Sequence, residues 1–247
     1  MTADPNRLKI ARDFGISGIA FSVARVPDSA RLYYGNSDFK LYSVDPLAEK
    51  PAPAAVSQTG HNSYITGVAL VGSSIVTGSY DQRLIWWDSA SGEQIRSVDA
   101  HDLWIRRVVA SPDGSLVASV ADDMHCRLWD ADSGRMIQQL DDHKTVTPHN
   151  YPSMLYAIAF SPDGKWLATG DKVGHIAIWE TDTGKKVTEL EAPKFYTWDP
   201  KQRRHSIGGL RSLAFSHDGQ RLAAGGIGSI GNIDHLGGPS RIEVFNW

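Results

Sequence analysis

The stretch Ile158-Ala-Phe-Ser-Pro-Asp-Gly164, followed by Trp166-Leu-Ala-Thr-Gly170, indicates the fold of this chain. Small and apolar residues alternate on both sides of an Asp-Gly turn, which is typical of a β-hairpin. The pattern returns as Val108-Val-Ala-Ser-Pro-Asp-Gly114 and as Leu213-Ala-Phe-Ser-His-Asp-Gly219. The chain therefore repeats one structural unit.

A third apolar run follows each hairpin, and a polar turn and a fourth run such as Met136-Ile-Gln-Gln-Leu140 come after it. The third run ends in an aromatic residue, at Tyr42, Trp87, Trp129, Trp179 and Phe245, with spacings of 45, 42, 50 and 66 residues. A period of about 40–45 residues with four short strands per unit is the signature of propeller blades. The sequence predicts an all-β chain, a β-propeller of four-stranded antiparallel blades with five blades present.

Composition narrows the class of function. The 247 residues carry a formal net charge of −3, which argues against a nucleic-acid or membrane-surface binder, because such proteins need a basic excess. Cys126 is the single cysteine, so an internal disulfide is excluded. No signal peptide and no long apolar run is visible, and we expect a cytoplasmic protein.

The chain resembles the WD-repeat (WD40) family, because Gly60-His61 precedes Trp87-Asp88 and Ala100-His101 precedes Trp129-Asp130. This resemblance implies a buried Asp–His–Ser/Thr–Trp hydrogen-bond network in each regular blade. Its members would be His61, Thr77, Asp81 and Trp87 in the second blade, His101, Ser119, Asp123 and Trp129 in the third, and Trp179 in the fourth.

The other blades depart from this pattern. Val173 stands where the fourth blade should have its aspartate, so that network is either broken or rebuilt, and His143 and His149 compete for the histidine position. Tyr42 replaces tryptophan in the first blade, Phe245 replaces it in the fifth, and His205 lies near the expected histidine position of the fifth. Such irregular repeats resemble bacterial WD-repeat proteins more than the regular eukaryotic ones.

We expect one domain over residues 1–247, with repeats at approximately 8–45, 46–90, 91–132, 133–182 and 183–247. Leu8 to Asp13 is predicted as an outermost strand. Two arrangements remain open, a closed five-bladed ring and the front part of a longer ring. We favour an incomplete seven-bladed ring, because seven blades are usual in the family that the chain resembles.

No catalytic, cofactor or metal motif stands out. The recurring histidines fit blade positions, and Gly226-Ile-Gly-Ser-Ile-Gly231 matches a dinucleotide fingerprint only in its letters, because no helical pattern follows it. We therefore predict a chain that is not an enzyme and that binds no cofactor or metal.

Function is expected on the face formed by the loops between strands two and three and between strands four and one, here called the top face. Three long insertions, 142–152, 191–209 and 225–240, fall there, and long loops on a rigid scaffold concentrate binding residues. The resemblance places the partner-contacting positions at the start of each innermost strand, on Tyr64, Thr66, Trp104, Arg106, Met154, Tyr156 and Arg211.

The tyrosine, tryptophan and arginine residues among these positions predict a non-catalytic scaffold that binds a protein or peptide segment with acidic or aromatic side chains. One alternative is an enzyme or small-molecule receptor that uses the enlarged loops, which would require titratable groups such as His149, Asp199, His205, Asp234 and His235 to converge. Another is a structural propeller module of a larger multidomain protein, with further blades or domains as its partners.

Overall fold

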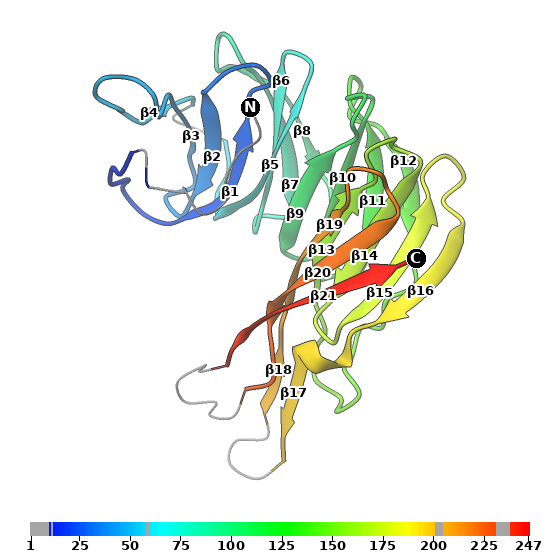
Figure 1. Ribbon diagram of the computed structural model, residues 1–247. Coiled ribbons are helices and arrows are strands. Elements are labelled where there is room, and N and C mark those ends of the chain that lie inside the picture. The colour runs from blue at the N-terminus through cyan, green and yellow to red at the C-terminus, as the bar shows by residue number, and fades with distance from the viewer. Residues whose placement is uncertain (1–9, 11, 58–59, 201–204, 231–237) are drawn as a thin grey trace.

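The computed structural model describes residues 10, 12–57, 60–200, 205–230 and 238–247, and of residues 205 and 206 only the backbone. The chain forms a β-propeller, as the repeat predicts, with its blades following one another around an arc (Figure 1). The first two blades are β1 (Ala20–Arg25), β2 (Leu32–Asn36), β3 (Leu41–Val44) and β4 (Ala54–Ala55), then β5 (Ile65–Val71), β6 (Ser74–Ser79), β7 (Arg83–Asp88) and β8 (Gln94–Asp99).

The third and fourth blades are likewise antiparallel and four-stranded. They are β9 (Ile105–Ala110), β10 (Leu116–Ala121), β11 (Cys126–Asp130) and β12 (Met136–Leu140), then β13 (Leu155–Phe160), β14 (Trp166–Asp171), β15 (His175–Glu180) and β16 (Lys186–Glu191). The fifth blade has three described strands, β19 (Leu210–Phe215), β20 (Arg221–Ile227) and β21 (Ser240–Asn246).

The repeated Ser-x-Asp-Gly turn joins the first two strands of a blade in the predicted way. Ser111 Oγ lies 2.6 Å from Asp113 Oδ1, and Gly114 donates its N–H to the Ser111 carbonyl at 2.9 Å. Gly114 has a φ of 74°, a conformation that glycine adopts without steric cost. The same serine–aspartate contact recurs at Ser161 and Ser216, so one local motif sets three hairpins.

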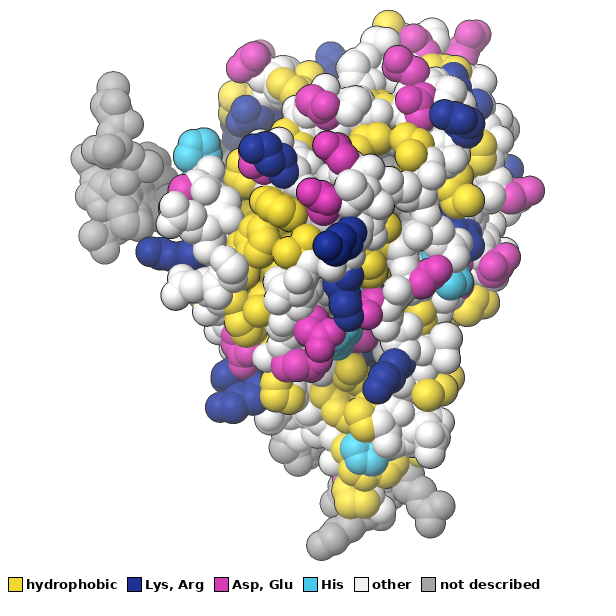
Figure 2. All heavy atoms as spheres, turned by 90° about the vertical axis from the view of Figure 1, so that its right-hand side faces the viewer, with side chains coloured by type: hydrophobic (Ala, Val, Ile, Leu, Met, Phe, Trp, Pro, Cys, Tyr) yellow, Lys and Arg dark blue, Asp and Glu magenta, His cyan; other side chains and the backbone are white. Residues whose placement is uncertain are grey.

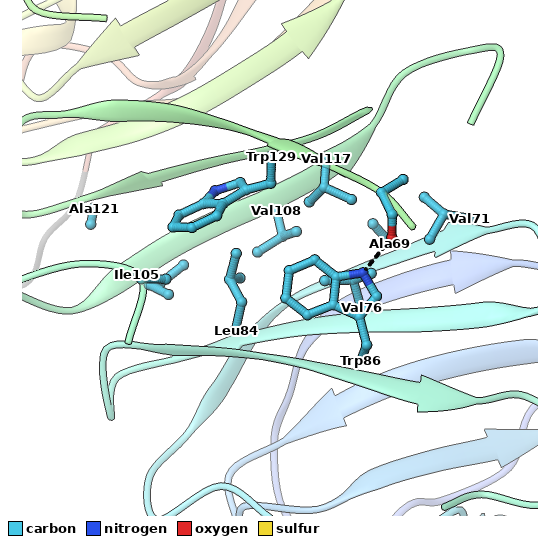
Figure 3. Close-up of a cluster of buried hydrophobic side chains, with 12 residues drawn as sticks. Ala69, Val71, Val76, Leu84, Trp86, Ile105, Val108, Val117, Ala121 and Trp129 are labelled. Carbon is cyan, nitrogen blue, oxygen red and sulfur yellow. Dashed lines mark hydrogen bonds between the residues drawn. The ribbon is translucent and has the colours of Figure 1, made fainter. Parts of the chain in front are cut away.

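The core lies between blades, where the apolar face of one sheet packs on the next. Trp86 and Leu84 from β7 meet Val108 from β9 and Trp129 from β11, all within one buried cluster (Figure 3). Trp86 also donates its indole N–H across the interface, to the Ala131 carbonyl at 2.8 Å. Innermost strands pack in the order β1, β5, β9, β13 and β19.

The predicted end of the third strand of the first blade is wrong. Strand pairing aligns Val44, not Tyr42, with Trp87, because Gly35 pairs with Leu41 as Gly78 pairs with Leu84. Val44 and Asp45 of the first blade therefore take the places of Trp87 and Asp88, and Tyr42, two residues before Val44, stacks on Tyr34. Of the predicted strand from Leu8 to Asp13, residues 8, 9 and 11 lie outside the described residues, and the others form no strand.

The insertion over residues 191–209, interpreted from the sequence as a loop, contains regular structure. A short 3₁₀ helix (Pro193–Phe195) leads into β17 (Tyr196–Asp199), which pairs with β18 (His205–Gly208). This hairpin projects from the lower end of the molecule as drawn in Figure 1. No helix in the described part of the chain is long and apolar enough to cross a membrane.

The described residues do not form the closed five-bladed ring that was one of the two open arrangements. Packing as extensive as that between consecutive innermost strands does not join β19 to β1 in the described part of the chain. The longer, seven-bladed ring stays a prediction.

Candidate binding site on the top face

Each innermost strand carries a β-bulge at the same place near its first residue. Strand pairing skips one residue in each blade, namely Phe21, Thr66, Arg106, Tyr156 and Arg211. A bulged residue is left out of the regular hydrogen-bond pairing between the two strands, which turns its side chain in a new direction. The bulged residues lie at equivalent places in the five blades, and all of them except the buried Thr66 have side chains that are at least partly exposed.

The residue two positions before each bulge is fixed by the strand next to it. Tyr64, Trp104 and Met154 accept backbone hydrogen bonds at 3.0, 3.0 and 2.8 Å from Tyr80, Asp122 and Lys172, which follow the second strand of each blade. The side chains of Tyr80 and Asp122 in turn contact residues of the innermost strand β9 and its start, Trp104 and Arg106. The site thus contains two sets of repeated positions, of which the sequence predicted only the set on the innermost strands.

Aromatic rings run across three blades without interruption. Tyr80 stacks on Trp104 with ring centroids 4.5 Å apart and planes 8° apart, and Tyr64 lies 5.8 Å from Tyr80. Phe21 and Phe39 of the first blade lie 5.4 and 5.7 Å from Tyr64. We call these five rings together with Arg106, Tyr156 and Arg211 the top-face ladder. Trp104 packs on a neighbouring blade, and 48% of its surface remains exposed.

Arg106 lies at the centre of the ladder. Its guanidinium carbon lies 4.9 Å from the Tyr80 ring, 5.4 Å from the Trp104 ring and 5.2 Å from the Tyr156 ring. It also forms a two-point ion pair with Asp122, at 2.7 and 2.6 Å. Burial lowers the pKa of Arg106, but the hydrogen bonds to Asp122 together with the charge of Asp122 and the nearby tyrosines outweigh burial, and the net pKa is raised. Arg106 is thus a fixed cation between aromatic walls.

Arg211 carries the top-face ladder onto the fifth blade, and Lys172 of the fourth blade adds a cation beside it. The guanidinium carbon of Arg211 lies 3.9 Å from the centre of the Tyr156 ring, and Arg211 donates to the Gly208 carbonyl at 3.0 Å. Burial, and then the proximity of Arg211, lower the pKa of Lys172. Arg106 pairs with Asp122, and the charges of Arg106, Arg211 and Asp122 all act on Lys172. Three basic groups against one acidic group give this part of the described structure a local positive charge on a chain of net charge −3.

The seven predicted contact residues separate into two groups. Tyr64, Trp104, Arg106, Tyr156 and Arg211 belong to the ladder. Thr66 does not present its side chain to a partner, because it is buried and donates its hydroxyl to the Ile105 carbonyl at 2.5 Å. Met154 lies below the ladder, with its sulfur against the Arg106 guanidinium and the Tyr156 hydroxyl.

The predicted buried networks are assembled in the second and third blades. Trp87 donates to Thr77 at 2.8 Å, the Thr77 hydroxyl lies 2.7 Å from His61 Nε2, and His61 Nδ1 lies 2.9 Å from Asp81. In the third blade the same order joins Trp129, Ser119, His101 and Asp123 at 2.9, 2.8 and 2.9 Å. Burial lowers the pKa of His101, so its neutral form donates to Asp123 and accepts from Ser119.

The fourth blade rebuilds its network with a different acid. His143, not His149, lies 3.0 Å from Asp171 and 2.8 Å from Thr169, to which Trp179 donates at 2.9 Å. Asp171 lies two residues before Val173, at the end of β14. His149 instead stacks on Trp198 of the projecting hairpin, with ring centroids 4.3 Å apart. In the fifth blade Ala224 and Phe245 take the hydroxyl and indole positions, and the side chain of His205 lies outside the described residues.

A second polar cluster lies beside the insertion over residues 142–152, at the rim of the fourth blade. His175 lies 2.8 Å from Asp142 and 2.6 Å from Glu191, and Lys186 donates to Asp142 and Glu189. Burial lowers the pKa of His175, but the hydrogen bonds to the two carboxylates outweigh it and raise the pKa overall. These acidic residues line a cavity of about 580 Å³. Figure 2 shows the β15–β16 side of the molecule, where acidic and basic side chains are interspersed.

Ligand atoms of Asp142, His175 and Glu189 lie within 4.8 Å of one another, which is close enough to hold a cation. These three residues are not the ones that the sequence offered for an enzyme or small-molecule receptor. Asp234 and His235 lie outside the described residues, and the side chain of His149 is engaged in ring stacking.

The WD domain, G-beta repeat family matches the chain in three segments, residues 55–88, 92–130 and 137–180. The chain is a WD-repeat protein. Each matched segment begins at or near an outermost strand and ends with the third strand of the next blade, which is the part of the chain where the buried networks are complete.

Curated relatives match over a small part of their length. The nuclear distribution protein PAC1 of Mycosarcoma maydis is 35% identical over 81 residues, which is 33% of this chain and 15% of that protein. PAC1 of Arthroderma otae is 36% identical over 63 residues, 26% of this chain and 14% of that protein. The CCR4-associated factor 4 homolog of Candida glabrata is 33% identical over 69 residues, which is 26% of this chain and 12% of that protein. These relatives are fungal and do not support the bacterial resemblance.

Proposed function

We propose that this WD-repeat protein is a non-catalytic scaffold whose top-face ladder binds a protein or peptide segment with acidic and aromatic side chains. The observation that carries the proposal is the joining of Trp104, Arg106, Tyr156 and Arg211 into one surface across the third, fourth and fifth blades. Arginine pairs with carboxylates in a two-point geometry and stacks on aromatic rings, so one extended segment could use both modes.

The composition and exposure of the ladder support this proposal. Tyrosine, tryptophan and arginine are the residues enriched in energetic hot spots of protein interfaces. Trp104 and Tyr64 expose 48% and 40% of their surfaces beside cations that are held by Asp122 and Tyr156. A side chain held in place by its neighbours loses little conformational entropy on binding.

The test is selection of binding peptides from a random peptide library displayed to the folded chain. We expect the recovered peptides to be rich in Asp, Glu and aromatic residues, and to lose binding to a chain carrying Trp104→Ala and Arg211→Glu. A matched control changes two exposed residues in bottom-face turns, Asp132→Lys and Lys185→Glu, and should bind like the wild type. Loss of binding in the control with retention in the top-face variant would place the site on the wrong face.

The rival interpretation is a receptor for a small cationic ligand or an enzyme at the rim of the fourth blade. The cavity of about 580 Å³ and the Asp142–His175–Glu189 cluster favour it. The same experiment separates the two, because the residues that line the cavity do not include Trp104 or Arg211. A ligand bound at the rim would still bind the top-face variant.

A further inference from the structure

Three residues at the rim of the fourth blade depart from the repeat, namely Asp142, His175 and Glu189. Strand pairing and the buried networks give their equivalents, which are Gly60, Arg83 and Ser97 in the second blade and Ala100, His125 and Gln139 in the third. These two blades carry at most one His, Asp or Glu at the three positions. The architecture of a blade therefore does not account for the set in the fourth blade.

The three side chains converge although they come from separate segments. Asp142 begins the insertion over residues 142–152, His175 begins β15, and Glu189 lies in β16. A ring nitrogen of His175 and a carboxylate oxygen of each acid all lie within 4.8 Å of one another. Among the residues that the structure describes, this is the one place where three such ligand atoms meet.

Glu191 orients the histidine toward this point. Its carboxylate lies 2.6 Å from His175 Nδ1, and His175 Nε2 lies 2.8 Å from Asp142. A histidine that binds a metal ion commonly donates its other ring N–H to a carboxylate, which fixes the ring and directs the free nitrogen at the ion. His175 has this arrangement, with Glu191 as the supporting carboxylate.

A positive charge already lies between the two acids of the cluster. Lys186 donates its ammonium to Asp142 at 2.6 Å and to Glu189 at 2.8 Å. The Lys186 side chain is 35% exposed and has a flexible four-carbon stem, so it can swing into solvent. A metal ion would therefore compete with this ammonium for the same two carboxylates.

We propose that Asp142, His175 and Glu189 bind a divalent transition-metal ion, with Zn²⁺ as the best match, in the place of the Lys186 ammonium. Imidazole nitrogen suits zinc and its neighbours, whereas Mg²⁺ and Ca²⁺ prefer oxygen ligands alone. Zinc binds both ligand types at about 2.0–2.2 Å, so small side-chain rotations close the three atoms around one ion. The three residues line the cavity of about 580 Å³, where the ion could hold a further ligand. The site uses no residue of the top-face ladder.

Isothermal titration of the full chain with ZnCl₂, after removal of metal by EDTA and dialysis, tests the proposal. We expect saturable binding by the wild type, and loss of this binding in His175→Ala. Glu191→Ala should weaken binding roughly 10–100-fold, because removal of a supporting carboxylate has an effect of this size on metal affinity. The matched control is His125→Ala, which changes the equivalent histidine of the third blade, paired with Asp141 at 2.5 Å, and should bind Zn²⁺ like the wild type.

Lys186→Gln gives the decisive result. This variant should bind Zn²⁺ more tightly than the wild type, because the competing ammonium is gone while the three ligands remain. A gain of affinity cannot result from misfolding, and a cluster that serves only as an ion pair would show no gain. A wild type without saturable binding, equal affinities of the wild type and Lys186→Gln, or a His175→Ala variant that binds like the wild type would each overturn the proposal.

Discussion

At the residue scale, the hydrogen-bond networks show which buried contacts can be predicted from the sequence. The predicted members of the second and third blades come together, because the spacing between histidine, aspartate and tryptophan is regular there. In the fourth blade the acid is Asp171 at the end of β14, and the sequence pattern pointed to Val173. The network requires a carboxylate close to the histidine, and a residue at either of two positions in this turn, 171 or 173, can supply it. The sequence pattern alone does not say which of the two positions is used.

The third-blade network predicts a specific loss of stability. Asp123→Ala leaves His101 without its acceptor in a buried site, and an unsatisfied buried group costs about 1–3 kcal/mol. We expect a decrease of this size in the free energy of unfolding measured in urea. Asp132→Ala, at an exposed turn aspartate, should change it little. Equal unfolding midpoints for Asp123→Ala and the wild type would contradict the assignment.

The rim histidine predicts a pH dependence with a definite sign. Because the folded state raises the pKa of His175, its protonated form stabilises the fold below its ordinary pKa of about 6.5, and this contribution is lost as the pH rises through the raised value. Asp142→Asn removes one of the hydrogen-bonding carboxylates. The stability difference between the wild type and this variant should therefore shrink as the pH rises past neutrality, in unfolding curves recorded at several pH values. A difference that grows over this range would be inconsistent with the ion-paired histidine.

At the element scale, strand order and hairpin turns follow from the sequence, and the β-bulges do not. Alternation of apolar residues locates each innermost strand, but a bulge depends on which residue the partner strand skips. For that reason Thr66 and Arg106, equivalent in the repeat, were both predicted to contact a partner, although Thr66 bonds to the Ile105 carbonyl. Tyr80, Asp122 and Lys172 were missed, and their signal was a shared position after the second strand of the blade.

Glycines in the second strand test the packing between blades. Gly78→Ala forces a Cβ against Val108 and Ile105 of the next blade, and overpacking a core costs about 1–3 kcal/mol. Gly225→Ala meets only the flexible Ser212 side chain, so we expect it to unfold at nearly the same urea concentration as the wild type. If both substitutions were equally costly, the glycine positions would reflect backbone conformation and not the approach of a neighbouring blade.

At the scale of the whole molecule, the repeat period predicted the propeller, and the net charge of −3 gave no sign of a basic centre. The local excess of Arg106, Lys172 and Arg211 over Asp122 arises only when the third, fourth and fifth blades are placed side by side. The top-face site thus depends on relations between blades that a one-dimensional pattern does not record.

The central claim is that a partner segment binds on the top-face ladder, and fluorine NMR of the chain labelled with 5-fluorotryptophan tests it most directly. Of the eight tryptophans, Trp104 is the half-exposed member of the ladder, and Trp86, Trp87 and Trp129 are buried between blades. The Trp104 resonance is the one that is missing from the spectrum of the Trp104→Phe variant. On addition of a selected acidic peptide, we predict that the Trp104 resonance shifts while the three buried resonances stay in place. A bound peptide that leaves the Trp104 resonance unmoved would contradict the account.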